Sequence, residues 1–353
     1  MKNYKIAIDV MGGDYAPKAA VEGAGLALQK HPELSVVLVG HENEIRAAMQ
    51  EYAVDASRVT VLHKDAVVPN DEHNPAEAAR SNRDSSMMTV MRMVRAKEVD
   101  AALSAGNTGA VLAGATIHVG RLRGVQRPAF AIAFPGRKGP VYILDVGANV
   151  DCKPQYLVQF AEMMTIYYRK QCGKQKPTVG LLNIGTEEAK GNELCKTVYP
   201  LLKEDPDIHF IGNIEGNQIL ESAADIIVTD GFAGNIMLKT TEGTAAYIMS
   251  LLKEAIGGSL LYKIGALLMK PALREMKKKL DPSQVGGAPM LGLDGVVIKA
   301  HGNSKGPAFA SAIDQCIAYL ENNVNGEITE MIAAKKALAS AKTSQEAGQE
   351  EKA

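Results

Sequence analysis

Short runs of β-branched and other apolar residues alternate along most of this chain with longer segments of helical character. Residues 4–10 have the pattern of a strand and residues 16–30 that of a helix, and the same order recurs at residues 34–39 and 42–52. Strands and helices that alternate at this spacing form a parallel sheet with helices packed on both faces. The sequence therefore predicts an α/β fold in which a doubly wound, mostly parallel sheet is the middle of three layers.

The alternation continues as far as residue 232. Further strands are expected at residues 59–62, 101–103, 130–134, 141–145, 178–183, 209–211, 226–229 and, later in the chain, 295–300. Further helices are expected at residues 75–96, 109–122, 156–170, 192–204 and 307–321. We expect the strands at residues 130–134 and 141–145 to pair across the turn at residues 136–139.

A different pattern starts after residue 232. Two long amphipathic helices, at residues 233–256 and 259–280, are expected on either side of Gly257 and Gly258. A helical hairpin of this length projects from a sheet more easily than it fits into one. We therefore divide the chain into an α/β core at residues 1–232 and 285–334, a projecting hairpin at residues 233–284, and a polar tail at residues 335–353 that is expected to be frayed helix or disordered.

Three roles are open for the hairpin. Its amphipathic helices are typical of a surface that packs against a second copy, which predicts a homodimer. The apolar stretch at residues 259–268, with lysines nearby, favours contact with a membrane surface, and the two roles can coexist. The third alternative is a lid within the same chain.

Composition argues against several functional classes. The net charge is −1, and aromatic residues make up only 5% of the chain with no tryptophan, so no nucleic-acid partner is expected. The four cysteines form no CxxC pair and the seven histidines lack metal-ligand spacing, so no metal site is expected. The first residues have a strand pattern rather than that of a signal peptide, and no run of about 18 apolar residues is present, which favours the cytoplasm.

Five segments rich in glycine, asparagine and threonine follow the apolar runs. They are residues 104–109 (SAGNTG), 145–149 (DVGAN), 183–186 (NIGT), 212–217 (GNIEGN) and 230–235 (DGFAGN). Glycine lets the backbone approach a ligand closely, and the helix that follows such a loop directs free N–H groups toward an anion. Because ligands of parallel sheets bind at the carboxyl ends of strands, these loops predict an anion pocket lined by several strand ends.

Residues 104–109 are the strongest single candidate, because they precede a helix of small residues that can lie close to the sheet. Asn107 and Thr108 add neutral donors suited to a phosphate or acyl oxygen, although a tight turn without a ligand is the alternative. His301, at the end of a strand, is a candidate acid or base. Lys239 and Lys305 are candidate phosphate partners, or simply solvated lysines.

Four acidic residues stand at or near strand ends: Asp9, Asp14, Asp145 and Asp230. They could hold a substrate group or steer a proton, but the favoured alternative is that each caps a helix or fixes a turn. No GxSxG, HExxH or GxxxxGK[ST] motif is present, and no GxGxxG follows the first strand. The motifs therefore indicate a pocket without a protein nucleophile.

At these positions the chain closely resembles the bacterial acyl-carrier-protein:phosphate acyltransferases. The resemblance is carried by residues 9–14 (DVMGGD), 103–110 (LSAGNTGA), 145–149, 181–188 (LLNIGTEE), 229–235, 286–289 (GGAP) and 300–302 (AHG). It implies that a long-chain acyl group moves from the thioester of acyl carrier protein to inorganic phosphate, with no cofactor. It also implies a fold similar to that of phosphotransacetylases and the isocitrate dehydrogenase group.

The resemblance further implies a homodimer at the cytoplasmic surface of the cell membrane. There, acyl phosphate would feed a membrane glycerol-3-phosphate acyltransferase at the start of phospholipid synthesis, and the membrane surface would be anionic. Acyl carrier protein is acidic, so we expect a basic docking surface on this chain. The candidate surfaces are Arg121, Arg123, Arg127, Arg137 and Lys138, or Arg274 with Lys277, Lys278 and Lys279.

In such a reaction phosphate is itself the nucleophile, so the protein has to position a dianion beside a thioester and stabilise the oxyanion. We expect His301 and Asn107 to be catalytic, with phosphate bound near them and with the proton donor for the thiolate unassigned. Asn149, Asn183 and Asn235 are expected around the acyl phosphate. The full set of expected substrate-binding residues is Asp9, Gly12, Gly13, Asp14, Ser104, Gly106, Thr108, Gly109, Asp145, Asn149, Asn183, Gly185, Thr186, Asp230, Gly234, Asn235, Lys239, Gly302 and Ser304.

Three other functions stay open. A phosphotransacetylase that uses acyl-coenzyme A would need the same pocket, and a comparison of the two acyl donors decides between them. A dehydrogenase of the isocitrate type is not excluded by the missing dinucleotide fingerprint, because that group does not use one. A non-enzymatic adaptor at a membrane surface would need only the hairpin and would leave the five loops unexplained.

Overall fold

The computed structural model describes residues 3–280 and 286–350, with side chains described as far as residue 276 in the first segment and residue 338 in the second. Within these residues, eleven strands form one sheet in the order β3-β2-β1-β4-β11-β10-β5-β6-β9-β7-β8. Their bounds are β1 Tyr4–Asp9, β2 Leu34–Gly40, β3 Val59–His63, β4 Ala101–Ser104, β5 Ala129–Phe134, β6 Val141–Leu144, β7 Thr178–Asn183, β8 His209–Glu215, β9 Ile226–Val228, β10 Ala288–Leu291 and β11 Val296–Lys299.

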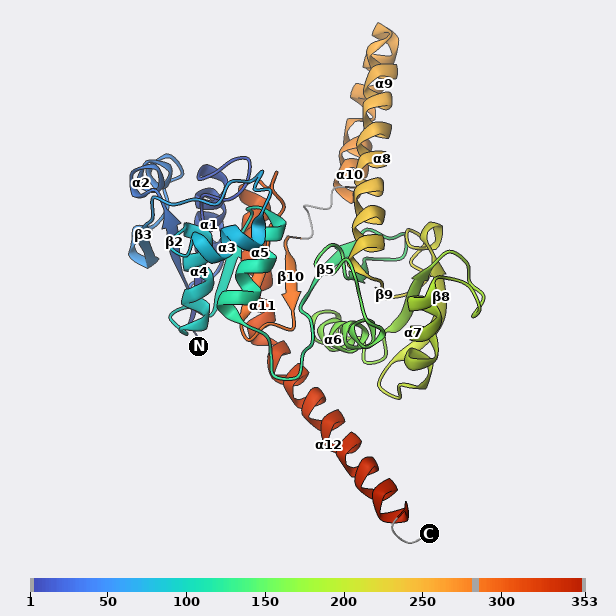
Figure 1. Cartoon of the computed structure of the whole chain (residues 1–353). Helices are drawn as coiled ribbons and strands as arrows, with labels where there is room; N and C mark the ends of the chain where they lie inside the picture. Colours follow the sequence, from blue (N-terminus) through green and yellow to red (C-terminus); the bar gives the residue numbers. More distant parts are fainter. Residues whose placement is uncertain (1–2, 281–285, 351–353) are drawn as a thin grey trace.

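Two parallel halves of the sheet meet at an antiparallel centre. Strands β3, β2, β1, β4 and β11 are parallel to one another, and so are β6, β9, β7 and β8. Between the halves, β10 is antiparallel to both β11 and β5, and β5 is antiparallel to β6. This arrangement confirms the mostly parallel sheet and the pairing across residues 136–139, and Figure 1 shows the halves as two lobes with β10 between them.

The antiparallel centre changes where the strand ends meet. Because β5 and β6 reverse the chain direction, the strands of the second half run opposite to those of the first. The carboxyl ends of β4 and β6 therefore do not share one edge of the sheet, as a single doubly wound sheet would require. Loops from the two halves can meet only across the boundary between the lobes.

Helices cover both faces of the sheet and bury two apolar clusters. Along β1, Ile6 and Ile8 belong to one cluster and Ala7 to the other, because successive side chains of a strand point to opposite faces. The first cluster includes residues of α1 (Lys18–Lys30), α6 (Pro154–Cys172) and α11 (Gly306–Glu321), and the second includes residues of α4 (Ser86–Arg95) and α5 (Thr108–Gly114). Helices α2 (Glu42–Glu51) and α7 (Glu193–Glu204) also pack on the sheet.

Three predicted elements of the core are corrected by the structure. The helix predicted at residues 75–96 is divided into α3 (Pro75–Ser81) and α4, because the Ser85 side chain accepts the Met88 N–H and starts a new helix. The helix predicted at residues 109–122 becomes, after α5, a π-helix that ends at Val119. The loop predicted at residues 212–217 lies mostly within β8, so Gly212 and Asn213 belong to a strand.

The predicted hairpin consists of three helices that rise from the second lobe (Figure 1): α8 (Gly231–Gly257), α9 (Leu260–Leu268) and α10 (Lys270–Leu280). The second predicted helix is divided at Met269, which caps α9. Many apolar side chains of α8 and α9 are exposed, among them Tyr247, Ile248, Leu261 and Leu268. None of the helices in the two described segments combines the length and apolarity needed to cross a bilayer. The last predicted hairpin residues, 281–284, lie outside the described residues.

The polar tail, predicted as frayed helix or disorder, is described as helix as far as residue 350. Helix α12 spans Val324–Glu350 and projects from the body of the molecule (Figure 1), so residues 335–350 continue a helix and residues 351–353 lie outside the described part. Its Lys335 Nζ lies 2.6 Å from both Glu162 Oε1 and Asp205 Oδ2. The two carboxylates are almost fully buried, and this ion pair fixes α12 to the middle of α6 and to the C-terminal end of α7.

Candidate active site

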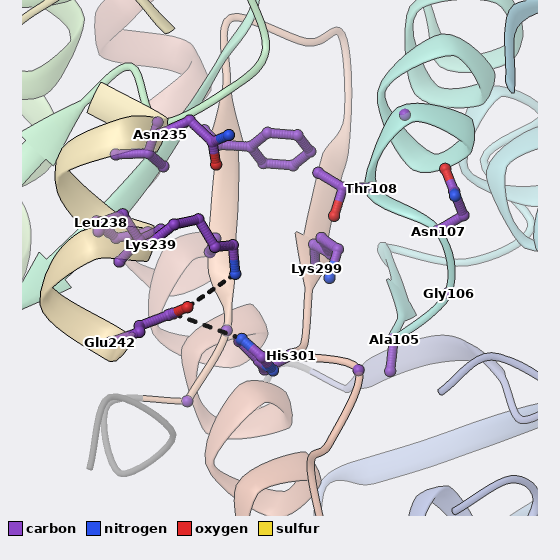
Figure 2. A pocket seen from close by; sticks show the side chains of 18 of the residues that line it. Ala105, Gly106, Asn107, Thr108, Asn235, Leu238, Lys239, Glu242, Lys299 and His301 are labelled. Carbon is purple, nitrogen blue, oxygen red and sulfur yellow. Dashed lines mark hydrogen bonds and ion pairs between the residues drawn. The ribbon is translucent and has the colours of Figure 1, made fainter. Parts of the chain in front are cut away.

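A cavity of about 430 Å³ lies at the boundary between the two lobes. One wall is the loop and helix start that follow β4, and the opposite wall is the second and third turns of α8 (Figure 2). β5, β10 and β11 line the space between the walls. The predicted site residues that line it are Asp14, Gly106, Asn107, Thr108, Gly109, Asn235, Lys239, His301 and Gly302.

A hydrogen-bond network holds the β4 loop in place. The buried Asp9 carboxylate accepts the Ser104 hydroxyl at 2.7 Å, and the same hydroxyl accepts the Gly106 N–H at 3.1 Å. A Cβ on Gly12 would lie only 2.6 Å from Gly106 N, so the first and fourth strand ends approach as closely as glycine permits. Burial raises the pKa of Asp9. Asp9, Gly12 and Ser104 thus shape the wall from behind and do not line the cavity.

Asn107 uses its side chain to build the loop. Its Oδ1 accepts the Ala110 N–H at 3.0 Å and caps α5, and its Nδ2 donates to Asn70 O at 3.0 Å. The loop after β1 joins the same assembly, because Asp14 N donates to Gly302 O at 2.8 Å. Hydrogen bonds among the loops after β1, β4 and β11, together with Asn70, therefore fix this wall before any ligand binds.

Charged residues gather at one end of the cavity. Glu242 Oε2 lies 2.8 Å from Lys239 Nζ, and its Oε1 lies 3.5 Å from His301 Nε2 (Figure 2). The His301 hydrogen bond and the Lys239 charge lower the pKa of Glu242 to about 2, so this carboxylate is ionised at neutral pH. Burial, together with the neighbouring Lys239, lowers the pKa of Lys299 to about 8. Three groups that can carry positive charge thus gather near the Glu242 carboxylate, and Asp14 is a second acidic residue of the cavity lining.

The rest of the cavity wall is largely apolar. β5 contributes Phe130, Ile132 and Phe134, and α8 contributes Leu238 beside its charged residues. The pairing of β10 with its two neighbours sets the order of these groups along the cavity. Ala288 of β10 lies opposite Lys299 of β11, and Met290 of β10 lies opposite Phe130 of β5. The charged end of the cavity therefore lies toward the Phe134 end of β5, and an apolar surface extends from it along the strand. The chemistry of the cavity suits a ligand with an anionic head and an apolar chain.

Asp145, predicted as a substrate ligand, organises the loop after β6. Its fully buried carboxylate accepts N–H groups from Phe130, Val146, Ala148 and Asn149 at 2.7–3.2 Å, and the Asn149 side chain donates to it at 3.0 Å. This is the turn-fixing role that was the favoured alternative. Neither Asp145 nor Asn149 is among the residues that line the cavity.

The start of α8 packs against that loop. Asp230 caps the helix by accepting the Ala233 N–H at 2.8 Å, and Gly231 N donates to Asn149 O at 2.7 Å. A Cβ on Gly234 would overlap Asp145 O and would lie 2.9 Å from Thr229 Cγ2. Asp230 and Gly234 thus position α8 from outside the cavity.

The structure places five further predicted site residues away from the cavity wall. Asn183, Gly185 and Thr186 follow β7, near the far edge of the sheet, and Asn183 bonds Ile184 N and Lys190 O within its own loop. Ser304 is buried behind the His301 loop, and its hydroxyl has no hydrogen-bond partner among the described residues. Gly13 supports the β1 loop by donating its N–H to Asn70 Oδ1 at 3.3 Å.

The basic residues predicted as a docking surface do not form one patch. Arg121, Arg123 and Arg127 precede β5, whereas Arg137 and Lys138 follow it. A strand of six residues separates the two groups by about 20 Å. The alternative patch at Arg274 includes Lys277–Lys279, whose side chains lie outside the described part of the chain.

The sequence did not single out four important residues of the cavity wall: Asn70, Leu238, Glu242 and Lys299. Two of them carry a signal that could have found them. Lys299 is a charged residue that directly continues the apolar run Val296–Ile298, and Glu242 stands three residues after Lys239 on a helix, which places both on one face. Within the described residues, no group of three or more histidine, cysteine, aspartate and glutamate side chains is arranged to hold a metal ion.

Comparison with solved structures supports the fold. The chain matches the EutD phosphotransacetylase from Staphylococcus aureus with a TM-score of 0.56 and 16% sequence identity, over 90% of this chain and 94% of that one. A branched-chain phosphotransacylase from Enterococcus faecalis V583 matches with a TM-score of 0.56 and 12% identity, over 89% of this chain and 98% of that one. At these identities the likeness shows the shared fold.

Sequence relatives identify the family. The family model described as "Fatty acid synthesis protein" matches residues 4–327. Proteins named phosphate acyltransferase are 47% identical in Clostridium botulinum, over 92% of this chain and 97% of the relative, and 45% identical in Brevibacillus brevis, over 93% and 97%. The chain therefore belongs to the fatty acid synthesis protein family, and it is an acyltransferase enzyme.

Proposed function

We propose that this enzyme transfers a fatty acyl group from the thioester of acyl carrier protein to inorganic phosphate and releases acyl phosphate. The observation that carries the proposal is the division of the cavity into a charged end, with Lys239, Lys299 and His301, and an apolar wall along β5. Phosphate is an anion and a fatty acyl chain is apolar, so the two parts of the product match the two parts of the cavity. The relatives are named phosphate acyltransferase, which supports the transfer of an acyl group to phosphate.

In this proposal bound phosphate attacks the thioester carbonyl directly. Cations are suited to hold a dianion in a partly enclosed site, where charge interactions are stronger than in water. Thr108 and the backbone around Gly106 face the same space and are suited to stabilise the oxyanion. The proposal needs no nucleophile from the protein, and the four cysteines agree with this: burial raises the pKa of each thiol, which disfavours a reactive thiolate.

The competing proposal is a transferase that takes its acyl group from coenzyme A. The two donors share the phosphopantetheine arm, so the cavity alone favours neither. The test is mass-spectrometric detection of acyl phosphate after incubation with phosphate and either palmitoyl-[acyl carrier protein] or palmitoyl-coenzyme A. We expect a much higher kcat/KM with the carrier protein. Equal or greater efficiency with the coenzyme A thioester would assign the second function, and the absence of acyl phosphate with both donors would refute acyl transfer to phosphate.

We infer that acyl carrier protein docks near Arg137 and Lys138, in the turn between β5 and β6. The turn follows Phe134, at the end of β5 toward which the charged part of the cavity lies. An acidic partner seated there would bring its thioester to the charged groups. The variant Arg137→Glu/Lys138→Glu should weaken carrier-protein binding at low salt at least tenfold, whereas the matched reversal Arg121→Glu/Arg123→Glu, at the other end of β5, should not. If the Arg121→Glu/Arg123→Glu variant weakens binding more, the docking site of the carrier protein lies at the other end of β5.

We also propose that the α8–α10 projection pairs two copies and contacts an anionic membrane surface. Tyr247, Ile248 and Leu251 expose apolar surface along α8, and Leu260, Leu261 and Leu268 do so on α9. Light scattering should give the mass of a dimer, and Ile248→Glu should give a monomer. Flotation with anionic vesicles should fail for Leu261→Glu/Leu268→Glu. An acyl phosphate made at that surface would be available to a membrane glycerol-3-phosphate acyltransferase.

A further inference from the structure

Lys299 occupies an unusual position for a lysine. It is the last residue of β11, in register with Ser104 at the end of β4, and its side chain lines the cavity. Figure 2 shows it between Lys239 on α8 and Thr108 at the start of α5. A cation at this point therefore stands at the level from which the β4 loop departs.

The contacts of Lys299 differ from those of the other cations around the cavity. Lys239 and His301 both contact the Glu242 carboxylate, whereas Lys299 Nζ donates to Ala300 O at 2.9 Å. A carbonyl does not neutralise the ammonium group, so Lys299 retains N–H donors for a ligand and gives up a proton more readily than a paired lysine. Its position and its contacts both suit a group that exchanges protons with a bound substrate.

The charged groups that face Lys299 come from three elements. Lys239 and Glu242 face it from α8, Asp14 faces it from the loop after β1, and His301 follows it on its own loop. Lys239 disfavours the charged form of Lys299, and Glu242 and Asp14 favour it, but burial is the strongest influence, and the pKa of Lys299 falls to about 8. A cysteine thiol has a pKa of about 8.5, so the ammonium group of Lys299 is acidic enough to protonate a leaving thiolate of this kind.

We propose that Lys299 is the catalytic residue that protonates the departing thiolate in the acyl transfer described above. The inference rests on the proposed function, because it assigns the proton donor of that reaction. Thr108 and the Gly106 backbone stabilise the oxyanion, Lys239 holds phosphate, and Lys299 acts on the sulfur.

The proton balance of this step closes without another reactant. An oxygen of hydrogen phosphate attacks the thioester carbonyl carbon, the carbon–oxygen bond forms, and the carbon–sulfur bond breaks. Lys299 Nζ gives one proton to the thiolate, which leaves as the thiol of the phosphopantetheine arm. The neutral amine then takes the proton that the phosphoryl group carried, because an acyl phosphate monoanion is more acidic than an ammonium group. Lys299 returns to its charged form, and one proton has moved from hydrogen phosphate to the thiol.

Two substitutions separate proton donation from simple charge. Lys299→Arg keeps a positive charge but cannot release a proton in the accessible pH range, and Lys299→Met removes both properties. We expect kcat with palmitoyl-[acyl carrier protein] to fall about 100-fold or more in both variants, which is the usual contribution of general acid catalysis. The KM for phosphate should change less than threefold in Lys299→Arg. Lys203→Met, on the surface of α7, is the matched control and should retain wild-type kcat.

The pH dependence of wild-type kcat gives a second measurement that needs no variant. It should decline above pH 8 as Lys299 loses its proton, the decline should persist in His301→Gln, and it should be absent from the residual activity of Lys299→Arg. If Lys299→Arg retains kcat within tenfold of wild type, charge alone is sufficient and the assignment is wrong. If the decline is lost in His301→Gln, the proton comes from the histidine. Failure of the wild-type enzyme to form acyl phosphate would instead refute the proposed function.

Discussion

The contact between Gly234 and the Asp145 loop gives a quantitative prediction about the site. A methyl group at residue 234 would overlap Asp145 O, which is backbone and cannot rotate away, and would lie 2.9 Å from Thr229 Cγ2. Carbon atoms and their neighbours reach favourable contact only at about 3.5–4.0 Å, so Gly234→Ala must shift the start of α8 by roughly 1 Å or more. The helix carries Lys239 and Glu242 one and two turns later, so both charged groups move with it.

Two effects of different size follow from this shift. Overpacking of a filled contact costs about 1–3 kcal/mol, of which the replacement of a helical glycine by alanine offsets about 0.5–1 kcal/mol. The free energy of unfolding should therefore fall by about 1–2 kcal/mol. A misplacement of about 1 Å in a catalytic group lowers rate about 100-fold, so the loss of kcat/KM should exceed what the modest destabilisation explains.

The same helix provides the matched control. A Cβ on Gly243 meets nothing within 4 Å, so Gly243→Ala should raise the free energy of unfolding by about 0.5–1 kcal/mol and leave activity unchanged. Urea unfolding and the acyl phosphate assay at 25 °C measure both quantities for the two variants. Equal stability and equal activity for Gly234→Ala and wild type would show that α8 has room to move and that the contact does not position the charged groups.

Two further predictions concern charged groups. His301 and Lys239 lower the pKa of Glu242 to about 2, so the ionised carboxylate stabilises the fold above its unfolded pKa, and this contribution is lost as pH falls from about 4.5 toward 2. The difference in melting temperature between wild type and Glu242→Gln should therefore shrink over that pH interval. A constant difference would contradict the pairing of Glu242 with His301 and Lys239. Lys335→Met should destabilise the protein by about 3 kcal/mol, because it leaves two almost fully buried carboxylates, Glu162 and Asp205, without their cation. Amide exchange in α12 should then accelerate, and unchanged exchange would show that the helix is held by other contacts.

The sequence predicted the sheet better than it predicted the site. Alternation of apolar runs and helical segments depends on local periodicity, which is why β1, β2 and their helices lie where they were expected. The break between α3 and α4 was missed, because it depends on a single cap at Ser85. The strand at His209–Glu215 was shortened in the prediction, because Gly212 and Asn213 have the composition of a loop although they pair with β7.

The site was harder to predict because glycine and asparagine serve two purposes. The loops at residues 104–109 and 145–149 look alike in sequence. Asn107 nevertheless lines the cavity, whereas the Asp145 carboxylate accepts hydrogen bonds from five donors in Phe130 and its own loop. Which loop faces the cavity depends on the direction of its strand, and β5 and β6 reverse that direction for the second lobe. The sequence of each loop does not indicate this reversal of strand direction.

The construction of α8 links the charged end of the cavity to the projecting helices. Asp230, Gly231 and Gly234 fix the first turn of α8 against the second lobe, and the helix then continues without interruption for 27 residues to Gly257. At about 1.5 Å per residue, Lys239 stands about a third of the way from the fixed turn to the end of the helix. Any tilt of α8 about its anchored start therefore displaces Lys239 and Glu242 by about a third of the displacement at its tip. A partner or surface that orders the projection would thereby also order the charged end of the cavity, whereas the Thr108 wall, which belongs to the other lobe, would stay where its own network holds it.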